Sequence, residues 1–182
     1  MYIEPPSSIA IIGAGPIGLE AALYARFLGY NVKIFERGRV ADHVLRWSHV
    51  RMFSPFRMNA SPLGLSALTA QDDKFQPPGP DEFLTGQQWA ERYLLPLADS
   101  DLVSDGLHEQ TRVISVTRKH FRKGEAIGDT RRAESPFRLL VEDEHRGRDE
   151  FAEVVIDTSG TFGKHNWLGA GGAPADGEMH CQ

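Results

Sequence analysis

The chain has 182 residues, of which 41% are hydrophobic and 25% are charged, so it is long enough and apolar enough for one packed domain. Its net charge of −5 argues against nucleic acid or an anionic membrane surface as a partner. The single cysteine, Cys181, excludes an internal disulfide and a redox dithiol, and no histidine pattern predicts a metal site. No apolar run approaches the roughly 20 residues that cross a bilayer, and no signal peptide is recognisable, so we expect a cytoplasmic protein.

The N-terminal segment alternates between strand and helix patterns. Residues 8–12 form a short β-branched run that is typical of a strand buried in a parallel sheet. Residues 16–29 carry apolar side chains at helical spacing, with Pro16 in the first turn and Gly29 at the end. Residues 31–36 form a second strand pattern. This order predicts a parallel, right-handed βαβ unit.

The rest of the chain predicts short helices and a second sheet. The proline- and glycine-rich residues 37–82 lack a clear period, which indicates a segment that lines a ligand or holds short helices. Thr85 and Gln88 are spaced as a capping box and predict a helix that bends or ends near Pro96. Three further segments predict an antiparallel meander with a charged, solvated tip after its first strand: residues 111–118, 137–143 and 150–160.

These elements predict an α/β fold, in which a Rossmann-like parallel sheet with a βαβ dinucleotide-binding unit is joined by an antiparallel β-meander. We expect one domain over residues 1–182, of which residues 161–182 form a loop-rich tail.

Gly13, Gly15 and Gly18 form a G-x-G-x-x-G turn directly between the first strand and the first helix. The first glycine permits the tight turn, the second lets the backbone approach a pyrophosphate, and the third allows close packing of helix on strand. The phosphates would face free N–H groups at the positive end of the helix. Glu36 ends the second strand, where a carboxylate accepts hydrogen bonds from ribose hydroxyls. The pattern predicts dinucleotide binding, with a purely structural glycine turn as the alternative.

These residues alone do not separate FAD from NAD, because both cofactors present an ADP group to the same unit. Glu36 disfavours NADP, since its carboxylate would repel a 2′-phosphate, although Arg37 and Arg39 are close enough in sequence to oppose that effect. Residues 46–59 place three arginines among aromatic side chains. Such a segment either contacts phosphate and covers a ring system or is a loop held to the core by its aromatics.

Four features of the sequence resemble one group of proteins: the G-A-G-P-x-G-L turn, the acid after the second strand, the segment W-S-H-V-R-M-F-S-P-F and the stretch V-V-I-D-T-S-G-T. The chain is similar, from Ser8 to about Glu178, to the FAD-binding half of flavoproteins related to flavin-containing monooxygenases and lysine/ornithine N-hydroxylases. These belong to the superfamily of the pyridine nucleotide-disulfide oxidoreductases. The resemblance implies FAD as the cofactor and a reaction in which NAD(P)H reduces the flavin before electrons pass to oxygen or another acceptor.

The resemblance also implies which residues contact FAD. The ADP group would lie on the glycine turn, which comprises Gly13, Ala14, Gly15, Pro16, Ile17 and Gly18. Glu36, with Arg37 beside it, would bind the adenosine ribose, and Val113 would offer its backbone to the adenine. The stretch Thr158, Ser159 and Gly160 would close over the nucleotide, whereas Trp47, His49 and Arg51 would lie towards the flavin. No catalytic residue is identified.

The chain departs from this group in two respects. It has no second G-x-G-x-x-G for NAD(P)H, because the glycines of residues 169–174 follow no strand and Pro174 stands where the third glycine is needed. Ala41 and Asp42 stand where relatives often have glycine. We therefore expect an incomplete two-dinucleotide fold, the N-terminal part of a larger flavoprotein whose nicotinamide half lies in a missing C-terminal half or a partner chain. The alternatives are a non-catalytic nucleotide-binding module and an NAD-dependent dehydrogenase, for which no catalytic pair is evident.

Overall fold

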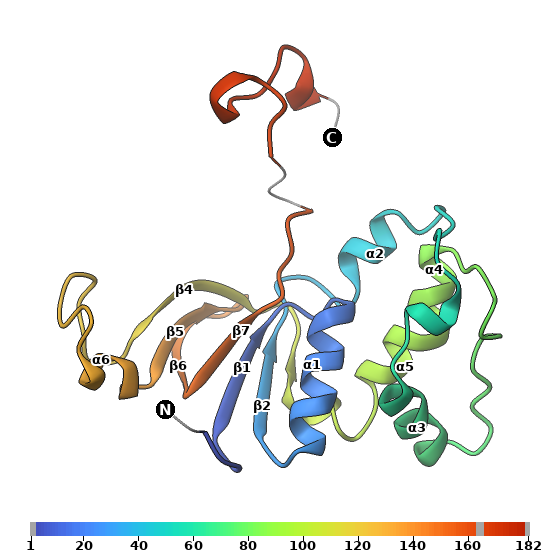
Figure 1. Ribbon diagram of the computed structural model, residues 1–182, viewed down its shortest axis with the longest axis horizontal. Helices are drawn as coiled ribbons and strands as arrows, with labels where there is room; N and C mark the ends of the chain where they lie inside the picture. The colour runs from blue at the N-terminus through green and yellow to red at the C-terminus, as the bar shows by residue number, and fades with distance from the viewer. Residues whose placement is uncertain (1–2, 163–165, 181–182) are drawn as a thin grey trace.

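The computed structural model describes residues 3–162 and 166–180, so Cys181 lies outside the described residues. A parallel sheet has the strand order β3-β2-β1-β7, formed by β1 (Ser8–Ile12), β2 (Asn31–Phe35), β3 (Leu107–His108) and β7 (Val154–Asp157). A second, antiparallel sheet has the order β4-β5-β6, formed by β4 (Arg112–Arg118), β5 (Phe137–Glu142) and β6 (Gly147–Ala152) (Figure 1). The two sheets confirm the predicted α/β fold with a Rossmann-like parallel sheet and a meander.

The first strand is buried on both faces, as its continuous apolar sequence predicts. Ile9 and Ile11 pack in the core shared with helix α1 (Pro16–Phe27), whereas Ala10 packs with the meander residues Leu139 and Val141. Gly29, just after α1, has a φ of 88°, a left-handed conformation that suits glycine and ends the helix. The parallel sheet thus lies between α1 and the meander.

The prediction of one strand over residues 150–160 is wrong, because the chain changes sheets at Glu153. Residues up to Ala152 pair antiparallel with β5, and residues from Val154 pair parallel with β1. Glu153 marks the crossing, where its backbone N–H donates to the Ser8 carbonyl at 3.1 Å and its carboxylate accepts from the Ser8 N–H at 2.7 Å. Residues 150–159 contain no proline or glycine, so no turn signal in the sequence marks the change of sheet.

The segment between β2 and β3 holds the short helices that its composition predicts. Besides single 3₁₀ and π turns, this segment holds α2 (Asp42–Arg46), α3 (Pro62–Gln71), α4 (Gly86–Trp89) and α5 (Leu95–Ala98), whereas α6 (Thr130–Glu134) lies between β4 and β5 (Figure 1). Both hydrogen bonds of the capping box between Thr85 and Gln88 are present, and a π turn links α4 to α5. Fully buried Tyr93, in that turn, donates to the Glu20 carboxylate of α1. This bond ties the small helices to the βαβ unit.

Two peripheral segments extend from this body. The tip between β4 and β5 contains α6, and most of its residues are exposed, as predicted. Residues 166–180 lie apart from the two sheets in Figure 1 and contain two 3₁₀ turns. No helix among the described residues is long and apolar enough to span a membrane.

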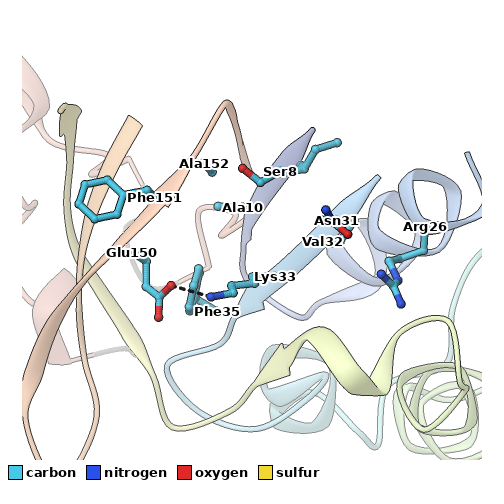
Figure 2. Close-up of a pocket in the computed structure, with 11 residues that line it drawn as sticks. Ser8, Ala10, Arg26, Asn31, Val32, Lys33, Phe35, Glu150, Phe151 and Ala152 are labelled. Atoms are coloured by element: carbon cyan, nitrogen blue, oxygen red, sulfur yellow. Dashed lines mark hydrogen bonds and ion pairs between the residues drawn. The ribbon is translucent and has the colours of Figure 1, made fainter. Parts of the chain in front are cut away.

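A hollow of about 160 Å³ lies between the amino-terminal halves of β1 and β2 and strand β6 (Figure 2). Lys33 of β2 reaches across to Glu150 of β6, with Nζ 2.8 Å from Oε2. Arg148 donates from Nε to Oε1 of the same carboxylate at 3.1 Å. The hollow is therefore the seam between the sheets, and charged side chains join them there.

His108 provides a pH-dependent element of this seam. Its ring stacks on Phe35, with centroids 5.4 Å apart and an interplanar angle of 14°. Burial, followed by the charge of Lys33, lowers the pKa of His108 below its usual 6.5. The unfolded chain then binds more protons than the folded chain, so the stability contribution is complete above about pH 6.5 and is lost as the pH falls towards the folded-state pKa.

We predict that lowering the pH from about 7.5 to about 5.5 decreases the melting temperature of the wild type more than that of His108→Phe. Phenylalanine keeps a ring against Phe35 but does not titrate. Thermal unfolding followed by circular dichroism at a series of pH values measures both slopes. Equal slopes for the two proteins would show that His108 does not bind a proton on unfolding in this range.

Candidate functional site

A groove of about 560 Å³ opens at the carboxyl ends of β1, β2 and β7. Its walls are the glycine turn with the start of α1, the segment from Phe35 to Val44, the edge strand β4 and the residues after β7. In α/β folds with parallel strands, ligands bind at this end of the sheet. The groove is lined by ten of the residues that the sequence predicts as cofactor contacts: Gly13, Gly15, Pro16, Ile17, Glu36, Arg37, Val113, Thr158, Ser159 and Gly160.

The glycine turn has the local geometry that its three glycines predict. Gly13 has a left-handed φ of 98°, and its N–H donates to the Phe35 carbonyl at 2.8 Å. A Cβ atom on Gly18 would lie 2.0 Å from the Gly13 carbonyl oxygen, so only glycine allows α1 to start this close to β1. A Cβ atom on Gly15 would have no atom within 4 Å, because that position faces the open groove. The turn therefore presents bare backbone to the groove.

The backbone amides at the start of α1 are available to an anion. Among the described residues the N–H groups of Gly15 and Ile17 have no hydrogen-bond partner, as is usual for the first turn of a helix. Pro16 follows Gly15 at the first helical position, where no N–H is needed. Free N–H groups and the positive end of the helix dipole together make an anion-binding surface.

Glu36 connects the turn to the loop that follows β2. Its Oε2 accepts from the N–H of buried Ala14 at 2.8 Å, and its Oε1 accepts from the N–H of Gly38 at 2.8 Å. Each carboxylate oxygen has a second acceptor site. Glu36 thus fixes the glycine turn and, from the wall of the groove, can still accept hydrogen bonds from a ligand.

Thr158 closes the turn from the side of β7. Its Oγ1 donates to the carbonyls of Ile12 at 2.8 Å and Gly13 at 3.1 Å. Next to it, one oxygen of Asp157 accepts from both the hydroxyl and the N–H of Ser159, at 2.7 and 3.0 Å, and these bonds lower the pKa of Asp157. The carboxylate of Asp157 therefore stays ionised and holds the loop after β7 beside the groove.

The remaining predicted residues lie outside the groove lining. Trp47 is half-buried, and its ring is so close to Gly86 that a Cβ there would lie 2.7 Å from it. Arg51 forms an isolated antiparallel bridge with Thr85, and His49 is exposed. The structure therefore does not bring these residues to the groove, and their place near a flavin stays a prediction.

Sequence reasoning missed several residues that line the groove. From α2, Asp42 and His43 line it, and His43 Nε2 lies 3.0 Å from Arg37 Nη2 while its ring packs on Phe162. In β4, a bulge leaves Ile114 unpaired between Val113 and Ser115. Helix α2 lies in a segment without periodicity, and the bulge depends on pairing with β5, so neither leaves a signal in the sequence.

Comparison with known proteins agrees with this architecture. Residues 10–130, more than half of the chain, match the family described as pyridine nucleotide-disulphide oxidoreductase. A search of the curated proteins finds no match. Among solved structures, the bacillithiol disulfide reductase Bdr from Bacillus cereus has a TM-score of 0.63 at 18% identity, covering 89% of this chain and 42% of the reductase.

Two further solved structures are also similar. An oxidised steroid monooxygenase bound to NADP has a TM-score of 0.60 at 20% identity, covering 85% of this chain and 26% of that one. The protein OTEMO, in a complex with FAD and NADP, has a TM-score of 0.57 at 18% identity, with coverages of 87% and 26%. The chain thus spans less than half the length of these structures, which share its fold.

The fold and the groove define a protein with a Rossmann-type fold and an open groove at the carboxyl end of its parallel sheet. The chain belongs to the pyridine nucleotide-disulphide oxidoreductase family, as the sequence resemblance predicts.

Gly15 and Gly18 offer a matched test of the turn. We predict that Gly18→Ala lowers the free energy of unfolding by about 1–3 kcal/mol, because the new methyl group overlaps the backbone of Gly13. We predict that Gly15→Ala changes it by less than about 1 kcal/mol, since its methyl group enters open space at a helix N-cap. Urea unfolding of the free protein measures both. Equal losses for the two variants would contradict the close approach of α1 to β1.

Proposed function

We propose that this chain is the FAD-binding part of a flavoprotein oxidoreductase that is monooxygenase-like and takes its electrons from NAD(P)H. The observation that carries the proposal is the glycine turn, whose open Gly15 position and free amides face a groove of about 560 Å³ at the carboxyl end of the parallel sheet. A pyrophosphate needs close approach to the backbone, and any side chain at position 15 would occupy the space that it needs.

The chain's own residues bind and orient the cofactor. The N–H groups of Gly15 and Ile17 would hold the pyrophosphate, and the carboxylate of Glu36 would hold the adenosine ribose. Val113, which precedes the bulge in the edge strand β4, would offer its backbone to the adenine. Thr158, Ser159 and Gly160, at the end of β7, would cover the nucleotide. When bound, FAD supplies the electron-transfer chemistry, and the protein supplies position.

The proposed electron donor follows from the relatives rather than from a site in this chain. The steroid monooxygenase is bound to NADP, and OTEMO is bound to FAD and NADP. This sequence has one G-x-G-x-x-G. We propose that the nicotinamide binds to a further segment or to a partner chain, and that Trp47, His49 and Arg51 lie on the side of the flavin.

A second candidate function is a nucleotide-binding module without turnover. The lone glycine motif favours it, because a flavin without a site for its reductant binds but is not reduced. The two functions make the same predictions for this chain alone and differ only when the reductant is added together with the further segment or partner chain that is proposed to bind the nicotinamide.

We predict that the purified chain binds FAD at least about tenfold more tightly than NAD or NADP, a difference of about 1.4 kcal/mol. Gly15→Val abolishes the binding while leaving the fold intact, because its side chain points into the groove. Isothermal titration calorimetry measures the affinities, and the circular dichroism spectrum of the variant is the control. Tighter binding of NAD, or unchanged binding of FAD by the variant, would overturn the assignment.

We further predict that NADPH or NADH does not bleach the flavin absorbance of the FAD-loaded chain alone. The reason is that no second glycine turn is present to hold the nicotinamide nucleotide. Anaerobic titration followed by absorbance, with dithionite as the positive control, measures this. Bleaching faster than that of free FAD would show that this chain contains its own donor site.

A further inference from the structure

The loop that follows Glu36, residues 37–41, is held by hydrogen bonds along its backbone. The Gly38 N–H donates to Glu36, and the Ala41 N–H donates to the Ala14 carbonyl at 3.0 Å. Between them, the Val40 N–H donates to Oε1 of Glu109 at 2.6 Å. The loop is therefore fixed near its start by Glu36 and at its end by Ala14 of the glycine turn. Its middle is fixed by Glu109, 69 positions further along the chain than Val40.

Glu109 belongs to a turn between β3 and β4, residues 109–111, whose three residues all contact the segment after β2. Gln110 donates to the Gly38 carbonyl twice, from its backbone N–H at 2.9 Å and from Nε2 at 3.0 Å. Buried Thr111 donates from its N–H to the Glu36 carbonyl at 2.8 Å. The 109–111 turn thus clamps both the backbone of Glu36 and the loop beyond it.

Backbone strain is concentrated at the two sides of this clamp. Gln110 has a φ of 50° and Ala41 has a φ of 57°, left-handed conformations that L-residues other than glycine rarely adopt. The only other described residue of this kind is Ala126, in the exposed tip. Strained residues persist where the surrounding bonds over-determine them, and such positions cluster at binding sites.

We propose that Glu109 and Gln110 are positioning residues that fix the carboxylate of Glu36 for a ribose 2′,3′-diol. The inference rests on the proposed function, because the diol belongs to the ADP group that the groove is proposed to hold. Glu109 and Gln110 do not line the groove. They act through Val40 and Gly38, and the Gly38 N–H is one of the two backbone donors that orient the Glu36 carboxylate.

The clamp makes recognition of the diol depend on residues remote from the ligand. Without Glu109, the Val40 N–H loses its acceptor and the 37–41 loop gains freedom. The Glu36 carboxylate then samples orientations in which its oxygens do not meet both hydroxyls. Contacts to the pyrophosphate are expected to change less, because the bond from the Gly13 N–H to the Phe35 carbonyl and the bonds of the Thr158 hydroxyl still hold the glycine turn.

The test compares ADP with 2′-deoxy-ADP as probes of the diol. We expect the wild type to bind ADP about tenfold more tightly, as for one hydrogen bond to a charged group. In Glu109→Ala, ADP binding weakens about fivefold while 2′-deoxy-ADP binding changes little, so the ratio of the two affinities falls towards one. Glu109→Gln retains an acceptor oxygen for Val40 and keeps the wild-type ratio. Glu134→Ala, an exposed glutamate in α6, is the control and changes neither affinity.

Calorimetry of the four proteins with both nucleotides gives the affinities, and melting temperatures establish that each variant is folded. Amide hydrogen exchange of Val40 and Gly38 in the ligand-free proteins gives a second measurement, which we expect to be faster in Glu109→Ala only. Equal weakening of both nucleotides in Glu109→Ala, or an unchanged ratio, overturns the positioning role while the proposed function stands. Failure of the wild type to bind ADP overturns the proposed function, and the positioning role falls with it.

Discussion

The carboxylate of Glu36 is the interaction on which the groove depends. It holds the Ala14 N–H of the glycine turn with one oxygen and the Gly38 N–H of the next loop with the other. One segment connects β1 to α1 and the other follows β2, and without a shared partner each would have an unpaired backbone donor at the sheet end. A buried or half-buried N–H without a partner is costly, so one side chain sets the spacing of the two loops.

The same interaction shows why a glycine motif and a terminal acid occur together. The acid has a structural task, because it fixes the turn, and a ligand-facing position on the groove wall. Both tasks need the same geometry. A turn that is held in place keeps the direction of its amides constant, and the two backbone bonds keep the free acceptor sites of the Glu36 carboxylate in a constant position. Preorganisation of this kind reduces the ordering that a ligand has to impose.

Those features that depend on neighbouring residues could be predicted from the sequence. The turn, α1 and β2 follow from local glycine geometry and periodicity, and the capping box of Thr85 and Gln88 is a spacing of three residues. Features that depend on distant partners were missed. The chain changes sheets at Glu153 because of bonds to Ser8, and the 109–111 turn acts on residues about 70 positions away. A single sequence contains no signal for such pairings.

The charges around the groove explain why so much depends on backbone atoms. Among the described residues that line it, Glu36, Asp42 and Asp157 carry carboxylates, whereas only Arg37 and Arg112 carry guanidinium groups and no lysine is present. The Arg37 guanidinium also lies at hydrogen-bond distance from His43. Side chains alone would therefore repel a pyrophosphate more than they attract it. In the proposed complex the attraction would come from the amides and the dipole at the start of α1, and we expect a side chain added at Gly15 to act on the ligand and not on the fold.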